Sequence, residues 1–348
     1  LLAGYVFISW IGSTGTVLMV AAVYAALAIV FALSDRLGVI IIVPLAIGLG
    51  ATGLWGNSVQ AFTSPCAVES DYFCIRIDDL AEAPGARLMA LDHLVHSIND
   101  QRDPGLFYSP YIHFVDEYAR ARLGDAHGHG GRDAYFIGGG GFTLPRAWAA
   151  EFQGRARLVV AEIDPAVTRA AADYLWLDPN APGLEIANQD ARTHLQSLAP
   201  EPTFDVVFGD AFHDISIPAH LVSQEFTEQI ARRLNPGGFY AMNIVDNGQD
   251  PRFLLSMART LGTQFASIEA WAERSQMGRN ERVTFVLIAT NSPGGQQVLD
   301  ASQGLERTWV RWPDSDLRAR ALAPDVVVLT DDYAPVDRLM SGLLTMPE

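Results

Sequence analysis

Between Asp133 and Thr290 the chain alternates short apolar runs with amphipathic segments, and this alternation limits the possible folds more than any other feature. Runs of this kind are typical of strands buried on both faces, and the segments between them have helical spacing. Repeated βαβ units produce parallel strands joined by right-handed crossovers. We therefore expect an α/β fold with a Rossmann-like, mainly parallel, doubly wound sheet. The expected strands are 134–137, 158–163, 184–187, 204–208, 240–245 and 282–289, and the expected helices are 143–152, 165–176 and 223–234.

Glycine or acidic residues follow four of the expected strands, where the ligand of a doubly wound sheet lies. The glycine run 138–141 allows a sharp turn and a close approach of backbone to ligand. Glu162, at the end of the next strand, can accept hydrogen bonds from ribose hydroxyls. Asp164 precedes Pro165, so it is also a good candidate for a helix N-cap. Asp190 follows the third strand, where a carboxylate can meet an adenine amino group.

These features indicate a nucleoside pocket. The NAD fingerprint G-x-G-x-x-G is not met, because Gly138 and Gly140 are followed by Thr143. A sulfonium nucleoside in a class I methyltransferase-type sheet is therefore preferred. Asp210 and Asp214 follow the fourth strand and are the candidate catalytic residues. The candidate cofactor-binding residues are Gly138, Gly139, Gly140, Glu162, Asp164, Asp190 and Ala191.

Several motifs resemble the spermidine synthase (polyamine aminopropyltransferase) family, in particular a bacterial branch in which this domain follows a membrane region. The resemblance extends over about residues 66–340. Its motifs are FIGGGGFTLPR (136–146), VVAEIDPAVTRAA (159–171), NQDARTHL (188–195), FDVVFGDAFHDISIPAHLVSQEF (204–226), LNPGGFYAMNIVD (234–246) and VVLTDDYAPVDRL (327–339).

The resemblance implies a role for three of these acids. Glu162 would bind the ribose, Asp190 would read adenine, and Asp210 would take the proton of an attacking amine. The co-substrate would be S-adenosylmethionine or its decarboxylated form, with an amine as acceptor and no metal. The expected substrate pocket includes Asp92, Tyr108 and Tyr333.

The chain also departs from the soluble enzymes of this family. Those enzymes carry an aspartate in the glycine motif, where this chain has Gly141 or Phe142. The second acid of the Asp210 motif lies four residues on rather than three. A glutamine of the substrate gate is replaced near His96, and a Tyr-His-Glu element is replaced by residues 109–111.

The first 55 residues hold almost no charge. Gly12–Ser34 is a neutral stretch long enough to cross a bilayer as a helix, and Leu37–Trp55 is a second such run. A signal peptide fits poorly, since there is no basic leading region. We expect transmembrane helices over 1–55, from the end of a longer membrane region. A linker over 56–66, a small antiparallel β domain over 67–123 and the Rossmann-like domain over 132–340 follow.

Charge and composition limit the partners. The net charge of −16 argues against nucleic acid, which requires a basic surface. None of the basic residues is lysine, so Schiff-base and P-loop lysine chemistry are absent. The two cysteines, Cys66 and Cys74, are interpreted as isolated thiols, with a hairpin disulfide as the alternative. His127 and His129 are too few for a metal site.

Three functions remain open from the sequence. The first is an aminopropyltransferase in the inner membrane, multi-pass, with its soluble domain in the cytoplasm, where these nucleosides occur. The second is a methyltransferase or other S-adenosylmethionine enzyme with a different acceptor. The third is a non-catalytic subunit of a membrane complex or homodimer. All three predict contact with the lipid bilayer.

Overall fold

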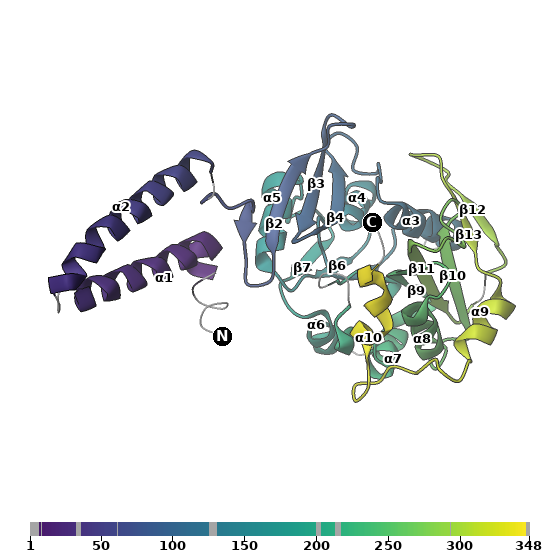
Figure 1. Ribbon diagram of the computed structural model, residues 1–348. Helices are drawn as coiled ribbons and strands as arrows, with labels where there is room; N and C mark the ends of the chain where they lie inside the picture. Colours follow the sequence, from purple (N-terminus) through teal and green to yellow (C-terminus); the bar gives the residue numbers. More distant parts are fainter. Residues whose placement is uncertain are drawn as a thin grey trace. The chain divides into compact units, whose positions relative to one another are not determined.

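A computed structural model describes residue 7 and residues 9–32, 36–60, 62–124, 131–199, 203–212, 217–292 and 294–345 (Figure 1). The chain divides into two compact units, Leu1–Ile77 and Asp78–Glu348. The domain boundaries predicted from the sequence stay predictions. Each unit is described separately below.

The first unit contains two long helices, α1 (Ser9–Ala32) and α2 (Arg36–Ser58). Among the described residues one helical stretch, Trp10–Phe31, is long and apolar enough to span a membrane. A membrane anchor and a signal sequence both have these properties, so the stretch supports one apolar helix. The second run does form α2, with Pro44 inside it, but multiple membrane passes are not supported.

A short hairpin follows the two helices in the first unit. Its strands are β1 (Val68–Glu69) and β2 (Cys74–Asp79), and they pair antiparallel. The prediction of isolated thiols was wrong, because Cys66 and Cys74 form a disulfide across this hairpin with their Cα atoms 5.2 Å apart. The antiparallel pairing of Glu69 with Cys74 brings the two ends of the segment together, which the spacing alone could not show.

The second unit begins with a small antiparallel hairpin, as the sequence predicted for this region, and a helix follows it. Strand β3 (Ala86–Leu91) pairs with β4 (Leu94–Asp100), and α3 (Pro110–Leu123) follows. Pro110 occupies the first turn of α3, where a missing N–H costs nothing.

The described residues of the second unit also form a mixed nine-stranded sheet in the order β12-β13-β10-β11-β9-β8-β5-β6-β7. The five strands from β9 to β7 are parallel, and the remaining four are antiparallel. The parallel half confirms the predicted Rossmann-like alternation. The strands are β5 (Ala134–Ile137), β6 (Leu158–Ala161), β7 (Leu184–Ala187), β8 (Phe204–Gly209), β9 (Leu234–Asn247), β10 (Ser267–Glu273), β11 (Arg282–Thr290), β12 (Val298–Asp300) and β13 (Thr308–Arg311).

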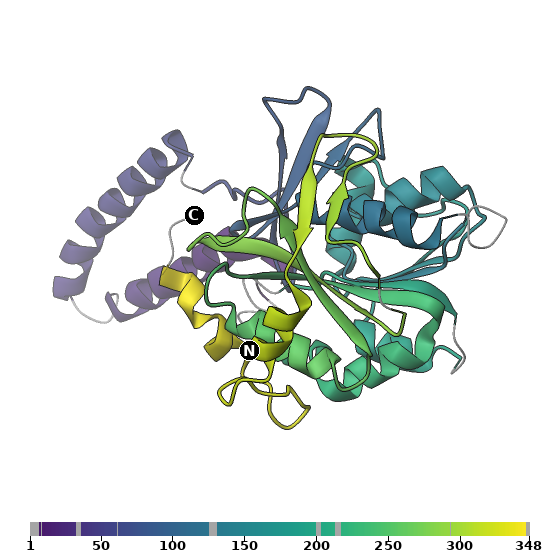
Figure 2. The ribbon, with the colours of Figure 1, turned by 90° about the vertical axis from the view of Figure 1, so that its right-hand side faces the viewer.

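Helices cover both faces of this sheet (Figure 2). Helices α3 and α4 pack on one face, and α7, α8 and α9 pack on the other. Apolar side chains from both the strands and the second group of helices form one continuous core. The remaining elements are α4 (Thr143–Phe152), α5 (Pro165–Tyr174), α6 (Ala191–Ser197), a 3₁₀ turn η2 (Ala219–Leu221), α7 (Gln224–Arg233), α8 (Arg252–Leu261), α9 (Asp314–Ala321), α10 (Val336–Met340) and η3 (Ser341–Thr345).

The C-terminal part differs from the sequence prediction. Residues 291–325 were expected to be irregular, but they contain β12, β13 and α9. These elements are short, and β12 has exposed residues on both sides of Leu299, so their apolar pattern is weak. Residues 326–329 were expected to form an edge strand but have no regular structure; only an isolated bridge joins Thr330 to Tyr333.

The sheet reverses its winding direction at β5. Strand β6 lies on one side of β5 and β8 on the other, which makes the ends of β5 and β8 the switch point. Here the backbones approach so closely that a Cβ on Gly138 would lie 2.6 Å from the carbonyl oxygen of Asp210. Gly138 also has φ +93°, which favours glycine. The topology therefore requires glycine at this position.

The disulfide predicts that purified full-length protein, kept unreduced, takes up no alkylating reagent at Cys66 or Cys74. After reduction, mass spectrometry should show both thiols alkylated. A Cys74→Ser variant is the control, since it should leave Cys66 reactive without reduction. Alkylation of both cysteines in unreduced native protein would contradict the pairing.

Gly138→Ala should lower the free energy of unfolding by about 2 kcal/mol or more, because it combines backbone strain with overlap against Asp210. Gly237→Ala is the matched control: Gly237 also has a positive φ, +86°, but its Cβ would meet no atom within 4 Å. Denaturant unfolding of both variants measures the difference. Equal losses would show that the close approach of β8 is unimportant.

Candidate functional site

The glycine loop after β5 is held by a buried carboxylate. Glu162, directly after β6, accepts hydrogen bonds from the backbone N–H groups of Gly139 at 2.8 Å and Gly140 at 3.2 Å. Its other oxygen accepts from the N–H of Asp164 at 2.9 Å. Burial raises the pKa of Glu162, and these three donors offset part of that effect. The acid predicted to bind ribose thus also fixes the loop beside it.

The second side of the loop is held by β4. The Ser97 hydroxyl accepts from the N–H of Gly141 at 2.7 Å, and the Asn99 amide donates to the carbonyl of Gly141 at 2.7 Å. The Asn99 carbonyl accepts from Thr143 at 2.7 Å. Phe142 has a left-handed φ of 54° and is fully buried. Where the soluble enzymes have an aspartate, this chain therefore has a glycine and a buried ring.

Asp210 lies at the end of β8 and is the best candidate for a base. The Tyr111 hydroxyl donates to its Oδ2 at 3.0 Å, and the Asn243 amide donates to its Oδ1 at 2.8 Å. Burial raises the pKa of Asp210 to about 6, although both hydrogen bonds lower it. A carboxylate with this pKa takes up and releases a proton near neutral pH, which suits general acid–base chemistry.

Asp210 and the glycine loop both line a small cavity of about 30 Å³. A volume of this size holds about one water molecule. Residues from β4, α3, the loop after β5, α4 and β8 line it, and they include His96 and Gly139. Asp210 and the loop therefore face the same space.

The second nucleoside-reading candidate lies at the adjacent strand end. Asp190 follows β7 and caps α6, with its Oδ1 accepting from the N–H of Thr193 at 2.9 Å. Its Oδ2 accepts from His220 Nε2 at 2.7 Å. Burial alone would raise the pKa of Asp190, but the hydrogen bonds from His220 and Thr193 lower it overall. Asp190 is therefore ionised and acts only as an acceptor.

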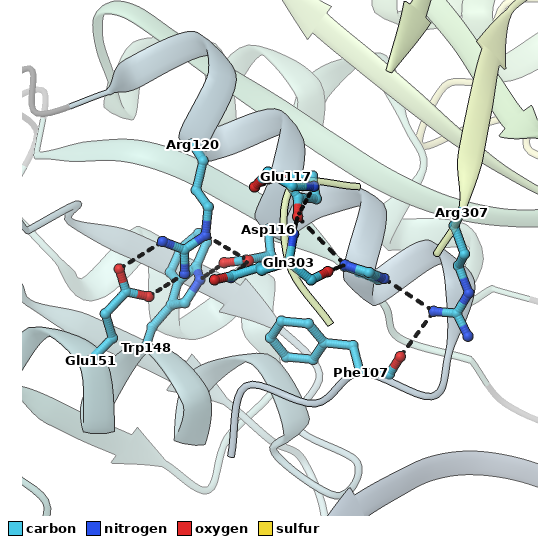
Figure 3. Close-up of polar contacts among 10 residues, drawn as sticks. Phe107, Asp116, Glu117, Arg120, Trp148, Glu151, Gln303 and Arg307 are labelled. Atoms are coloured by element: carbon cyan, nitrogen blue, oxygen red, sulfur yellow. Dashed lines mark hydrogen bonds and ion pairs between the residues drawn. The ribbon is translucent and has the colours of Figure 1, made fainter. Parts of the chain in front are cut away.

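Helix α3, which carries Tyr111, is fixed by buried polar contacts (Figure 3). Asp116 accepts from Trp148 Nε1 at 2.7 Å, from Arg120 Nε at 2.8 Å and from Gln303 Nε2 at 3.1 Å. Arg120 also pairs with Glu151 on α4. These contacts join α3 both to its neighbouring helix and to the β12–β13 connection.

Two further groups tie α3 to the same connection. Glu117, fully buried, accepts from the backbone N–H groups of Ser302 at 2.8 Å and Gln303 at 3.1 Å. Arg307 lies within 3.2 Å of His113 Nδ1. Because arginine only donates, His113 Nδ1 accepts and its Nε2 donates to the Gln303 carbonyl at 3.0 Å. Burial, and then Arg307, lower the pKa of His113, which keeps the ring neutral.

The other predicted site residues have the following surroundings. Asp164 caps α5 through the N–H of Ala166 at 2.8 Å, as the N-cap interpretation predicted, and Ala191 begins α6. Tyr108 donates to Asp100 at 3.3 Å, and Tyr333, half exposed, accepts from Arg338 at 2.8 Å. Their roles in ligand binding stay predictions.

The remaining predicted residues lie in a turn or outside the described part of the chain. Asp92 lies in the β3–β4 turn with a φ of 54°. Asp214, His127 and His129 fall outside the described residues. Within the part of the chain that the structure describes, no group of His, Cys, Asp and Glu side chains could hold a metal ion.

Sequence reasoning missed three residues that contact the predicted acids: Tyr111, Asn243 and His220. A signal exists for Asn243, because it is a polar residue inside an apolar strand and must find a partner there. Tyr111 and His220 show no such signal, since a polar residue in a first helical turn or a short loop is ordinary.

The chain is similar in sequence to two proteins named as polyamine aminopropyltransferases. No family model matches the chain. A probable polyamine aminopropyl transferase of Bifidobacterium longum is 26% identical over 242 residues, covering 64% of this chain and 52% of that protein. A polyamine aminopropyltransferase of Vibrio vulnificus is 30% identical over 108 residues, 31% of this chain and 36% of that protein. The matches thus span about half or less of these relatives.

One solved structure shows the same fold. A probable spermidine synthase from Corynebacterium glutamicum aligns with a TM-score of 0.66 and 21% identity, covering 79% of this chain and 99% of that one. The chain is thus a distant homologue of proteins named polyamine aminopropyltransferases, with the α/β fold expected from its sequence.

Tyr111→Phe should raise the pKa of Asp210 above about 6, because it removes a hydroxyl whose hydrogen bond favours the ionised carboxylate. Carbon-13 NMR titration of labelled aspartate side chains measures the change. Tyr108→Phe is the matched control, since that hydroxyl bonds Asp100 instead. An unchanged Asp210 pKa in Tyr111→Phe would show that the contact carries no electrostatic weight.

Proposed function

We propose that this chain is a transferase of the aminopropyltransferase type, which binds decarboxylated S-adenosylmethionine and moves its aminopropyl group to an amine. The observation that carries the proposal is Asp210, a carboxylate with a pKa of about 6, held by Tyr111 and Asn243 beside the glycine loop. The distant relatives named polyamine aminopropyltransferases support the same reaction class.

The residues suit the chemistry of that transfer. A neutral amine nitrogen attacks the methylene carbon next to the positive sulfur and forms a C–N bond. The C–S bond breaks, and its electron pair stays on sulfur, which leaves a neutral thioether nucleoside. The new ammonium then gives up a proton, and the ionised Asp210 accepts it. Glu162 and Asp190 would hold ribose and adenine while this occurs.

The residues of the glycine loop favour a second candidate function, in which the enzyme uses a different acceptor. The loop position that binds the amine in the soluble enzymes is taken by Gly141 and the buried Phe142, and no carboxylate replaces it there. An S-adenosylmethionine enzyme with another acceptor, such as a methyltransferase, is therefore the alternative to test.

We further propose that the apolar helix attaches the enzyme to a membrane, because α1 exposes large apolar side chains such as Trp10 and Phe31. Contact with lipid, with other membrane subunits or with a second copy would then cover them. A cytoplasmic site suits the nucleoside substrate. The Cys66–Cys74 disulfide instead favours an oxidising compartment for its segment, so the alkylation test bears on this placement.

Calorimetric titration of the full-length protein tests the nucleoside pocket. We expect binding of decarboxylated S-adenosylmethionine and of methylthioadenosine, the thioether product, in the micromolar range. Preference for S-adenosylmethionine over its decarboxylated form would favour the methyltransferase alternative. If none of the three binds at millimolar concentration, the proposed function is wrong and a non-catalytic role remains.

Asp210→Asn should lower single-turnover transfer by about 100-fold or more, since general base catalysis contributes on this order. In the wild type the rate should rise as pH increases through about 6, because Asp210 ionises and gains the capacity to take a proton. The Asp210→Asn variant should lose this rise in rate with pH. Asp246→Asn is the control. Burial also raises the pKa of Asp246 to about 6, but its carboxylate accepts a hydrogen bond from the N–H of Leu254 in α8 instead of contacting Tyr111 or Asn243.

A further inference from the structure

We propose that His220 is a positioning residue that holds Asp190 as an acceptor for a 6-amino purine, and so makes the site prefer adenine nucleosides to 6-oxo ones. The inference rests on the proposed function, because it assumes that Asp190 reads the base. It assigns a role to a residue that lies within the 204–226 motif but that the transfer chemistry does not use.

The contacts of Asp190 fix both of its oxygens. The N–H of Thr193 donates to Oδ1 and His220 Nε2 donates to Oδ2, so the carboxylate cannot rotate without losing a hydrogen bond. Each carboxylate oxygen can accept more than one bond, and Asp190 remains partly exposed. It can therefore accept a further donor in a fixed direction.

The backbone that carries His220 is fixed in turn. The Arg192 guanidinium donates to the His220 carbonyl at 3.0 Å and makes two bonds of 2.6 Å to the carboxylate of Asp331. Leu221 and Val222, the next two residues, are buried in the core. Because this turn is held by hydrogen bonds and by the core, the His220 side chain has a fixed position beside Asp190.

This chain of contacts gives a physical role to the TDDY segment, 330–333. Asp331 lies far from Asp190 in sequence, yet one arginine links the two through His220. The Asp331 N–H also donates to Glu225 at 3.0 Å, which ties the segment to α7. The segment thus supports the turn that orients the base-reading acid.

The chemistry of the pair defines the preferred base. An ionised carboxylate only accepts hydrogen bonds, so it attracts the exocyclic amino group of adenine and repels a 6-oxo group. A donor on Oδ2 stabilises the ionised form and its direction at once. Without His220, Asp190 keeps only its bond to Thr193 and can turn away from the base.

The test compares the binding of methylthioadenosine and methylthioinosine to the full chain by calorimetry. His220→Ala should weaken methylthioadenosine binding on the order of five-fold and should lower the ratio between the two affinities. His220→Gln should restore both, since its amide can donate from nearly the same place as Nε2. A merely structural defect would weaken both nucleosides alike and leave the ratio unchanged.

Two further variants complete the design. Asp331→Asn should act in the same direction as His220→Ala but more weakly, because Arg192 loses its ionised partner. Glu185→Gln, which breaks the exposed pair with Arg157 at the opposite end of the parallel strands, should change neither affinity.

The outcomes separate this inference from the proposed function. Wild-type protein that binds neither nucleoside overturns both. Wild-type protein that binds methylthioadenosine, with His220→Ala unchanged in affinity and ratio, overturns only the role of His220. Tighter binding by His220→Ala also overturns it, since His220 would then compete with the base.

Discussion

The buried carboxylate of Glu162 is the interaction on which the rest of the site depends. A charge this deep in a protein is tolerated only when hydrogen bonds replace its lost water, and three backbone N–H groups do so here. The cost of breaking them keeps the glycine loop close to β6. That position in turn sets where the loop meets β4 and leaves the space in front of Asp210.

The two ends of the site differ in their contact with water. Asp190 is partly exposed, and its hydrogen bonds outweigh its burial, so its pKa falls. Asp210 accepts hydrogen bonds from the Tyr111 hydroxyl and the Asn243 amide, but burial outweighs them and its pKa rises to about 6. The balance between desolvation and hydrogen bonding therefore separates a permanent acceptor from a group that can exchange protons.

The sequence predicted the parts of the fold that depend on local pattern. Strand ends and the acids that follow them could be read from apolar runs, and Glu162, Asp190 and Asp210 lie at such ends. Their partners could not, because Tyr111 and Asp210 are 99 residues apart and no periodicity records such a contact. Residues 291–325 were misjudged for a related reason: short edge strands stabilised by neighbours carry little apolar signal of their own.

The prediction of two isolated thiols failed on geometry. Cys66 and Cys74 are eight positions apart in sequence, and only the strand pairing brings their Cα atoms within range of a disulfide. The glycine loop shows the opposite case. Its glycines were correctly placed at a strand end, but the residue that distinguishes this chain there is Phe142, whose burial no motif indicates.

The polar contacts of α3 have a consequence for how the chain acquires its structure. The groups that satisfy Glu117 come from residues 185 and 186 positions later, so during synthesis the helix is made long before its partners exist. Until those partners are made, the helix face that is buried in the folded protein, with its carboxylates Asp116 and Glu117, must remain in contact with water. Contacts of such long range slow folding, so the helix that carries Tyr111 has its full set of buried partners only after the β12–β13 connection has been made.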